Sequence, residues 1–178
     1  MLSSRKVILY IACSLDGFIA REDGDINWLS IVERKGEDYG YRKFIDTVDT
    51  VIMGRKTYDK VLSFGIGFPH ADKECYVITS TRHGIDANVT FYNGDIKDLI
   101  SRIRKQGGKN IFIDGGSDIV ALLRSHGLVD EYVISILPIL LGKGIRLFKD
   151  VAAEEQLHLV GHTAFASGLV QLYYRRED

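Results

Sequence analysis

The chain has 178 residues, of which 46% are hydrophobic and 26% are charged, and its formal net charge is −1. This length suits one domain, residues 1–178, and the near-neutral charge gives no reason to expect nucleic acid or a membrane surface as a partner. No apolar run approaches the roughly 20 residues that span a bilayer, and residues 1–6 lack the apolar stretch of a secretory signal. Cys13 and Cys75 lie in apolar segments without metal-ligand spacing, so we expect reduced thiols and a cytoplasmic protein.

Strands and helices are predicted to alternate through the first half of the chain. The apolar, β-branched segment 6–13 is typical of a central strand that is buried on both faces, and 18–20 predicts a short extended continuation. A helix is expected over about 36–47, because apolar side chains recur there at intervals of three and four residues. The next segment, 48–53, predicts a buried strand that ends at a glycine and leads into a helix over 55–62.

The second half continues this alternation and then changes to strands alone. Strands are predicted over 74–79, 89–92, 110–114 and 131–136, and helices over 95–105 and 118–125. Asp95 and Ser117 are suitable N-caps for the two helices, and the glycines at 107–108 end the first helix. The alternating segments 157–163 and 169–174 predict an antiparallel hairpin. We therefore expect a three-layer α/β/α fold whose central sheet is mostly parallel, with an antiparallel C-terminal hairpin.

The segment 48–59 is the first candidate for a phosphate site. Its strand ends at Gly54, and Arg55, Lys56 and Thr57 open the helix that follows. A helix N-terminus carries backbone N–H groups without intrahelical partners, and these donors, together with the helix dipole, favour phosphate. A plain strand-to-helix turn with an exposed basic first turn explains the same residues, so both interpretations stay open.

A second turn repeats this geometry farther along the chain. The pair Gly115–Gly116 ends a strand and Ser117 follows it, and adjacent glycines allow the backbone to approach a ligand closely. Ser80, Thr81 and Arg82 leave a third strand at the same predicted edge, where open α/β sheets bind ligands. The three loops together indicate a ligand with phosphates at more than one point, and three ordinary loop exits are the alternative.

Sequence motifs for several other chemistries are absent. No triplet of glycines follows the first strand, and there is no Walker motif. The five histidines show no paired metal spacing, so no metal site is expected. His158 and His162 lie four residues apart in a predicted strand, and we expect them to share one face as ordinary polar residues.

Four carboxylates are expected near the edge where the loops meet, and one of them differs from the others. These residues are Asp16, Asp38, Asp59 and Asp114. Asp38 precedes the aromatic side chains of Tyr39 and Tyr41, and Trp28 lies upstream of it. A carboxylate among aromatic groups can donate or relay a proton. As the acid of a helix N-terminus, Asp38 would instead interact with the helix dipole, and both interpretations stay open.

Taken together, these motifs resemble the dihydrofolate reductase superfamily. The segments that carry the resemblance are Met53–Tyr58, Ile113–Ser117 and Ser14–Gly17. Leu137–Phe148 is similar to the reductase domain of the bacterial riboflavin-biosynthesis deaminase–reductase. The resemblance covers essentially the whole chain, and it implies a dihydrofolate reductase-like fold and an NADPH-dependent reductase.

The resemblance also implies roles for single residues. The turn at Gly54 would hold cofactor phosphates, and the loop at Ser80 would lie near the adenosine 2′-phosphate, which favours NADPH over NADH. The glycine pair would contain a cis peptide and face the pyrophosphate and nicotinamide, and the loop at Asp16 would close over the nicotinamide. Asp38, by its spacing from Gly54, fits the position of the substrate carboxylate. The implied cofactor-binding residues are Asp16, Gly17, Gly54, Arg55, Lys56, Thr57, Ser80, Thr81, Arg82, Gly115, Gly116 and Ser117.

The sequence departs from both relatives at the substrate side. Asn27 replaces the proline that precedes the tryptophan in dihydrofolate reductases, Tyr10 stands where riboflavin-pathway reductases usually carry lysine, and no deaminase zinc motif is present. The leading hypothesis is an NADPH-dependent reductase of a pterin-like or aminopyrimidine-like heterocycle, with Asp38 as the candidate catalytic residue. Trp28, Tyr41 and Phe64 are the expected walls of the substrate pocket. The alternative is an NADP(H)-binding module without turnover, used for sensing or assembly. The segment 131–144 is a candidate homodimer interface.

Overall fold

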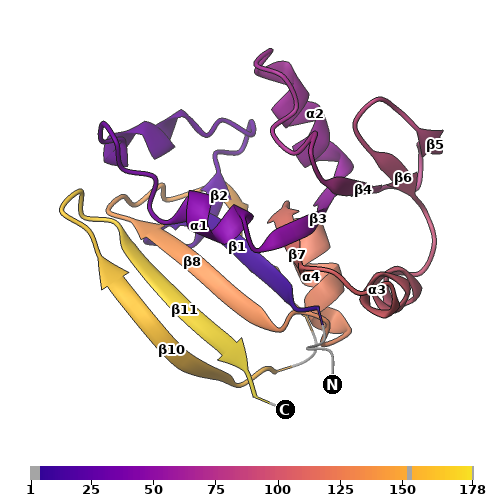
Figure 1. Cartoon of the computed structure of the whole chain (residues 1–178). Coiled ribbons are helices and arrows are strands. Elements are labelled where there is room, and N and C mark those ends of the chain that lie inside the picture. Colours follow the sequence, from indigo (N-terminus) through magenta and orange to yellow (C-terminus); the bar gives the residue numbers. More distant parts are fainter. Residues whose placement is uncertain (1–4, 152–153, 178) are drawn as a thin grey trace.

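The computed structural model describes residues 5–151 and 154–177. Within these residues nine strands form one sheet in the order β10-β11-β8-β1-β7-β3-β4-β6-β5, and the short strands β2 and β9 pair separately (Figure 1). The strands are β1 (Val7–Ser14), β2 (Phe18–Ala20), β3 (Val48–Gly54), β4 (Glu74–Ile78), β5 (Gly84–Ile85), β6 (Thr90–Tyr92), β7 (Asn110–Gly115), β8 (Glu131–Leu137), β9 (Ile145–Arg146), β10 (Leu157–Ala164) and β11 (Val170–Arg176). The helices are the 3₁₀-helix η1 (Asn27–Val32) and the α-helices α1 (Tyr41–Ile45), α2 (Arg55–Ser63), α3 (Ile96–Lys105) and α4 (Ser117–Ser125).

The centre of the sheet is parallel. Strands β8, β1, β7, β3, β4 and β6 all run in the same direction, so their carboxyl ends meet at one edge. The hairpin of β10 and β11 joins β8 in antiparallel orientation. The mostly parallel sheet with an antiparallel C-terminal hairpin is therefore confirmed. The antiparallel pair of β5 and β6 was not predicted, because Gly84–Ile85 is too short to show a periodic pattern.

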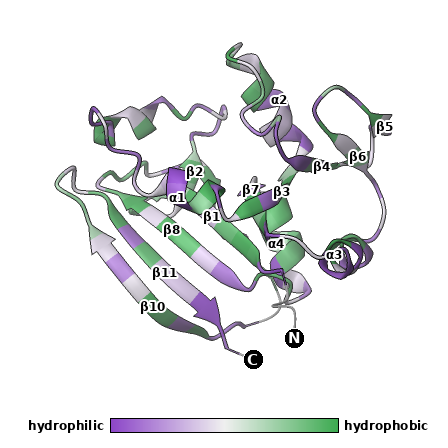
Figure 2. Ribbon diagram, in the orientation of Figure 1, coloured by the Kyte–Doolittle hydropathy of each residue, from purple (hydrophilic) through white to green (hydrophobic). Residues whose placement is uncertain are grey.

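Helices cover both faces of the central strands. On one face, α3 and α4 pack in a cluster that includes Ile111 and Ile113 of β7. On the other face, Phe44 of α1 and Tyr58 of α2 pack in a cluster with Phe112. Successive side chains of β7 thus point to opposite layers, as expected for a strand that is buried on both sides. The predicted three-layer arrangement is confirmed, and Figure 2 shows that β1 at the centre is mostly hydrophobic, whereas hydrophilic residues recur along β10 and β11.

Helix α1 is much shorter than the predicted helix over 36–47. Gly36, Tyr39 and Gly40 have φ angles of 83°, 55° and 80°. This left-handed backbone is incompatible with the interior of an α-helix. The segment before Tyr41 is therefore an irregular loop, although the apolar spacing does place Phe44 against the sheet.

The helix ends agree with the sequence at α3 and differ at α4. Asp95 is the N-cap of α3, as predicted, and its side chain accepts a hydrogen bond from the backbone N–H of Lys97. Ser117 was expected to cap α4, but it is the first residue of that helix, and Gly116 is the N-cap. Among the residues that the structure describes, no helix is both long and apolar enough to cross a membrane.

The two histidines of β10 do not share a face, contrary to expectation. A β-bulge interrupts the pairing of β10 with β11, so His158 lies opposite Arg175 and His162 lies opposite Leu172. These partners are three residues apart on a regular strand, which places them on opposite faces of the sheet. The extra residue of the bulge reverses the alternation between the two histidines.

Candidate functional site

Five loops leave the carboxyl edge of the sheet next to one another. They follow β8, β1, β7, β3 and β4, which are neighbours in that order and mutually parallel. The residues of these loops are 137–144, 14–17, 115–117, 54–57 and 79–82. All the residues that the sequence predicts for cofactor binding lie on four of these loops, and the fold brings them to one edge.

Gly54 and Gly116 approach each other closely where β3 and β7 end. A Cβ atom on Gly54 would lie 3.1 Å from Cγ1 of Ile119 and 3.8 Å from the backbone nitrogen of Gly116. A Cβ atom on Gly116 would lie 3.2 Å from Oγ1 of Thr57. The peptide bond between Gly115 and Gly116 is cis, as the resemblance implies. Any larger residue at either position would displace a neighbour, so the two turns fit together because both carry glycine.

The helices that begin at these two turns lack side-chain caps. Gly54 and Gly116 are the N-caps of α2 and α4, and no side chain in the described part of the chain caps either helix. Helix α3 provides a contrast, because Oδ1 of Asp95 accepts a hydrogen bond of 2.7 Å from the nitrogen of Lys97. Two neighbouring N-termini therefore present backbone N–H groups and the positive ends of two helix dipoles, a donor set that suits phosphate groups.

A carboxylate links the basic residues of the β3 and β4 loops. Nη1 and Nη2 of Arg82 lie 2.7 Å and 3.1 Å from the two carboxylate oxygens of Asp59. Nη1 of Arg55 lies 3.0 Å from Oδ2 of the same residue. The fold thus joins the turn at Gly54 to the loop at Ser80 through one acidic side chain.

The other predicted cofactor residues of this region differ in exposure. Lys56, Ser80 and Thr81 are exposed, whereas Ser117 is buried at the start of α4. The backbone N–H of Thr81 donates a hydrogen bond of 3.1 Å to Oγ1 of Thr79, which orders the start of the β4 loop. Lys56, Ser80 and Thr81 are therefore the members of this set with side chains accessible from solvent.

Asp16 fastens the loop after β1 to the loop after β8. Its carboxylate accepts hydrogen bonds from Oγ of Ser14 at 2.6 Å and from the backbone nitrogens of Leu141 and Gly142 at 3.1 Å and 2.7 Å. These bonds, above all the one from Ser14, lower the pKa of Asp16 to about 2. Gly17 completes the turn, and its backbone N–H donates to the carbonyl of Ser14. The carboxylate of Asp16 is thus engaged within the protein, and it holds the β1 loop in place.

A cavity of about 710 Å³ lies on the α1 side of the sheet. Small-ligand sites typically have volumes of roughly 300–1,000 Å³. Strands β1 and β8 line its floor, and η1 with the loop before α1 lines its walls. The lining residues are Tyr10, Ala12, Leu29, Val32, Glu33, Arg34, Lys35, Glu37, Asp38, Tyr39, Tyr41, Ser135, Leu137 and Leu169.

Hydroxyl and amide groups form a network at the floor of the cavity. Nε2 of Gln171 donates to the Tyr10 hydroxyl at 3.0 Å and to Oγ of Ser135 at 3.1 Å. The Tyr10 hydroxyl donates to the carbonyl oxygen of Tyr39 at 2.9 Å. Burial raises the pKa of Tyr10, and burial is also the main cause that raises the pKa of Tyr41 to about 12. Both phenols therefore keep their protons at neutral pH.

Asp38 lies at the rim of this cavity, in the loop before α1, and its side chain binds backbone N–H groups at the start of that helix. Its side chain is exposed, and its two carboxylate oxygens accept hydrogen bonds from the backbone nitrogens of Gly40 and Arg42 at 3.0 Å and 3.2 Å. The interaction with the helix start that the sequence suggests is therefore present. The same carboxylate belongs to the lining of the cavity, so it is also accessible to a ligand there.

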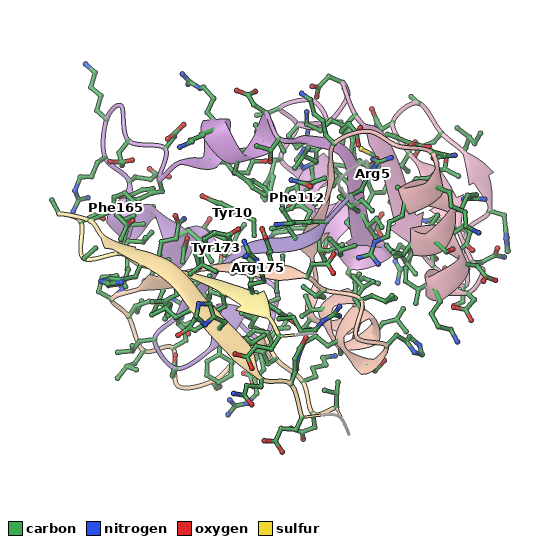
Figure 3. The ribbon with its side chains drawn as sticks, turned by 60° about the horizontal axis from the view of Figure 1, so that its bottom comes forward. Arg5, Tyr10, Phe112, Phe165, Tyr173 and Arg175 are labelled. Carbon is green, nitrogen blue, oxygen red and sulfur yellow. The ribbon has the colours of Figure 1, made fainter. Side chains whose placement is uncertain are left out.

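Asp114 and His70 form a pair that sequence reasoning did not single out. Asp114 precedes the glycine pair, and its register on β7 places it on the same face as Phe112 and Tyr10, which are labelled in Figure 3. Its Oδ2 lies 3.4 Å from Nε2 of His70, a residue only 2% exposed. Nδ1 of His70 has no hydrogen-bond partner among the described residues. After burial, the charge of Asp114 contributes to the raised pKa of Tyr41, a residue of the cavity lining.

The local sequence marks one member of this pair and not the other. Asp114 directly precedes a glycine pair at the carboxyl end of a buried strand, which is a recognisable position. His70 lies 44 residues away in a loop, and no periodic pattern connects it to β7. Only the fold brings the two side chains together.

Of the three predicted pocket walls, Tyr41 lines the cavity. Trp28 is 4% exposed and packs against Leu137 and other apolar residues of the cavity wall, and its Nε1 has no partner in the described part of the chain. Phe64 is 45% exposed at the end of α2, and the ammonium group of Lys60 lies 5.8 Å from its ring centre. Phe64 is not among the residues that line the cavity, which come mainly from β1, β8 and the segment 29–41.

Sequence comparison identifies a protein family and two relatives. A family profile described as the RibD C-terminal domain matches residues 5–171. The Bacillus subtilis (strain 168) protein YwjB is 44% identical over 173 residues, which cover 97% of this chain and 98% of that protein. YyaP of the same organism is 33% identical over 187 residues, which cover 97% and 96% of the two chains. Both relatives are described as uncharacterized proteins.

Solved structures of similar proteins share the fold along almost the whole chain. A putative riboflavin biosynthesis protein from Shewanella sp. PV-4 has a TM-score of 0.91 and 31% identity, with 97% of this chain and 99% of that chain covered. A deaminase/5-amino-6-(5-phosphoribosylamino)uracil reductase from Thermotoga maritima has a TM-score of 0.73 and 17% identity, with 98% and 57% covered. Enterococcus faecalis dihydrofolate reductase, complexed with NADP(H) and RAB-propyl, has a TM-score of 0.67 and 16% identity, with 97% of each chain covered. The last two comparisons concern the fold alone, and the predicted resemblance is confirmed.

Proposed function

This chain belongs to the RibD C-terminal domain family, and on that premise we propose that it is an NADPH-dependent reductase of a pterin-like or aminopyrimidine-like heterocycle. Residues 1–178 would act as one reductase domain. The observation that carries the proposal is the meeting of two uncapped helix N-termini, at Gly54 and Gly116, on a sheet whose neighbouring strands β1 and β8 line a cavity of about 710 Å³. The same sheet thus offers donors for phosphate and space for a heterocycle.

The residues at the edge fit a dinucleotide cofactor. The backbone N–H groups at the starts of α2 and α4 suit a pyrophosphate, and the glycines allow it to approach the backbone closely. Lys56, Ser80, Thr81 and Arg82 lie on the side of the edge away from the cavity and suit the adenosine phosphates. When it is bound, NADPH supplies a hydride for transfer to the substrate.

The remaining roles belong to residues of this chain. The loop that Asp16 holds against the β8 loop limits the access of water to the edge beside Gly115. Tyr10, Ser135 and Gln171 present hydroxyl and amide groups on the floor of the cavity, which suit the N–H and C=O groups of a heterocycle.

Two carboxylates are candidates for the proton that accompanies hydride transfer. Asp38, the candidate catalytic residue from the sequence, would hold the heterocycle or relay a proton at the rim of the cavity. Asp114 precedes the glycine pair and lies on the same face of the sheet as the cavity. His70 lies at hydrogen-bond distance from its carboxylate. Both carboxylates lie on the side of the sheet that carries the cavity.

The proposal is tested first by binding and then by turnover. NADPH is titrated into the protein while the fluorescence of Trp28, the single tryptophan, is recorded. The oxidation of NADPH is then followed with a panel of heterocycles that includes dihydrofolate and 5-amino-6-(5-phosphoribosylamino)uracil. Binding followed by oxidation with one member of the panel is the expected result.

Two other outcomes would contradict the proposal in different ways. Failure of NADPH to bind at millimolar concentration would exclude both the reductase and the nucleotide-binding module. Binding without oxidation across the panel would favour the module. We also propose a cytoplasmic location and a homodimer. Strand β8 lies between β1 and β11 inside the sheet, so of the predicted interface segment 131–144 only the part 138–144 has exposed side chains for such a contact. Size-exclusion chromatography with light scattering would test the dimer.

A further inference from the structure

The basic residues of the β3 and β4 loops already hold an anion that belongs to the chain. Asp59 lies one turn into α2, and both terminal nitrogens of Arg82 contact its carboxylate, at 2.7 Å and 3.1 Å. Arg55 adds a third contact, at 3.0 Å. The side chains of Arg55, Asp59 and Arg82 are 38%, 36% and 39% exposed, so the cluster faces solvent.

We propose, on the basis of the function proposed above, that Asp59 determines cofactor selectivity by occupying the guanidinium fork that the 2′-phosphate of NADPH would otherwise bind. NADPH differs from NADH only in this phosphate on the adenosine ribose. A preference for NADPH therefore requires cations that are available on the adenosine side of the edge. In this chain, Arg55 and Arg82 are both paired with one carboxylate, that of Asp59.

The geometry indicates that Asp59 competes with a phosphate for Arg82, rather than holding Arg82 in place to bind the phosphate. A guanidinium group binds carboxylate and phosphate through the same pair of parallel N–H groups, and Arg82 uses this pair on Asp59. The two arginines and Asp59 together carry a charge of about +1 rather than +2, so a phosphate dianion meets a weaker field. An exposed ion pair contributes little to folding, so the chain loses little stability when Asp59 is neutralised.

The neighbouring carboxylate does not have the same role. Asp86 lies near Arg82, but one of its oxygens accepts a hydrogen bond of 2.5 Å from the hydroxyl of Tyr58. Its other oxygen accepts from the backbone nitrogens of Asn88 and Val89, at 2.8 Å and 2.9 Å. Asp86 is thus engaged in the turn before β6, and Asp59 remains the acid that contacts both arginines.

Asp59→Asn tests this role, because it removes the charge and keeps the shape. Dissociation constants are measured by calorimetry for NADPH and NADH, and for adenosine 2′,5′-bisphosphate and adenosine 5′-monophosphate. We expect the variant to bind the two 2′-phosphorylated ligands roughly three- to tenfold more tightly and the other two within about twofold of the wild type. The gain should shrink as ionic strength rises, because the competing groups are exposed.

Two further variants serve as controls. Asp59→Glu keeps the charge and should retain the selectivity of the wild type. Asp98→Asn makes the same change of charge on the exposed surface of α3 and should leave all four dissociation constants unchanged. Melting temperatures of all variants establish that each is folded.

Weaker binding of the 2′-phosphorylated ligands by Asp59→Asn would overturn the inference, since Asp59 would then hold the arginines in place for the phosphate. An unchanged ratio of NADPH to NADH affinity would overturn it as well. The failure of every nucleotide to bind the wild-type protein would instead refute the proposed function. These results can be told apart, because the role of Asp59 is tested by the ratio of NADPH to NADH affinity. The proposed function is tested by whether any nucleotide binds the wild-type protein.

Discussion

Thr57 and Gly116 meet across two turns that are far apart in the sequence. The hydroxyl oxygen of Thr57 would lie 3.2 Å from a Cβ atom on Gly116, which is closer than side chains normally pack. The pairing of β3 with β7 in parallel explains the contact, because Met53 lies opposite Gly115 and both strands end there. The two turns therefore form one surface, and a substitution in either affects both.

Gly116→Ala is expected to weaken NADPH binding. The φ angle of Gly116 is −85°, which alanine adopts without strain, so the effect comes from the added methyl group. Overpacking at such a contact costs about 1–3 kcal/mol, and we expect the dissociation constant for NADPH to rise by roughly tenfold. Calorimetric titration measures this change. Gly161→Ala on β10, where a Cβ atom meets nothing within 4 Å, is the matched control and should bind NADPH like the wild type.

Gly144→Ala is expected to destabilise the fold strongly. The φ angle of Gly144 is +151°, and a Cβ atom there would lie 2.2 Å from the carbonyl oxygen of Ala20. Backbone strain and collision with the backbone together should cost roughly 3 kcal/mol. Gly142→Ala has a positive φ of 74° but open space, so it should cost only about 1 kcal/mol. The free energy of unfolding of both variants is measured by urea denaturation. Equal losses in Gly144→Ala and Gly142→Ala would show that the contact with Ala20 does not constrain the chain.

The stability that Asp16 contributes is expected to depend on pH. Its pKa is lowered from 3.8 to about 2, so the folded state favours the ionised carboxylate. The contribution is therefore complete above the unfolded pKa of about 4 and is lost as the pH falls through about 2. The difference in unfolding free energy between the wild type and Asp16→Asn should be constant near neutral pH and should disappear at the acidic end. A difference that does not change with pH would mean that the hydrogen bonds from Leu141 and Gly142 do not require the charge.

The sequence was sufficient for the layers of the fold, because its strands and helices carry clear apolar periods. The buried segment Val48–Met53 and the stripe of Ile96, Leu99, Ile100 and Ile103 on α3 are found where the pattern places them. The predictions that were wrong concern local departures from regular helix and strand geometry. The positive φ angle of Tyr39 interrupts a helical pattern, and the bulge in β10 reverses an alternation. A pattern of residue types does not predict such a φ angle or bulge, because contacts with the rest of the fold determine them.

The candidate site was predictable to the extent that it consists of strand ends. Gly54 and Gly116 could be placed at one edge, because parallel strands end on the same side of a sheet. The pairing of Arg82 with Asp59 and of His70 with Asp114 was not predictable, because each joins residues from separate loops. The full set of residues that form the cavity walls was also not predictable from the sequence. Phe64 was expected to be a wall together with Tyr41, but it lies exposed at the end of α2 and does not line the cavity.

Asp38 offers the sharpest test of the catalytic proposal, because its two roles can be separated. Its carboxylate caps α1 through Gly40 and Arg42, and it also lines the cavity. Asp38→Asn keeps an oxygen that can accept the capping hydrogen bond, whereas Asp38→Ala removes it and should cost about 1 kcal/mol of stability. If the charge or the proton of Asp38 serves the substrate, both variants should lose roughly 100-fold or more in kcat/KM for the heterocycle that the panel identifies.

Asp114→Asn completes this comparison. The asparagine retains an oxygen near His70 while it removes the charge on the cavity side of the sheet. A large loss of kcat/KM in Asp114→Asn, with Asp38→Asn unchanged, would assign the proton to the carboxylate beside the glycine pair and refute the role of Asp38. Comparable losses in both variants would indicate that the two carboxylates act on the same substrate. NADPH affinity should change little in either variant, because both carboxylates lie on the cavity side of the edge.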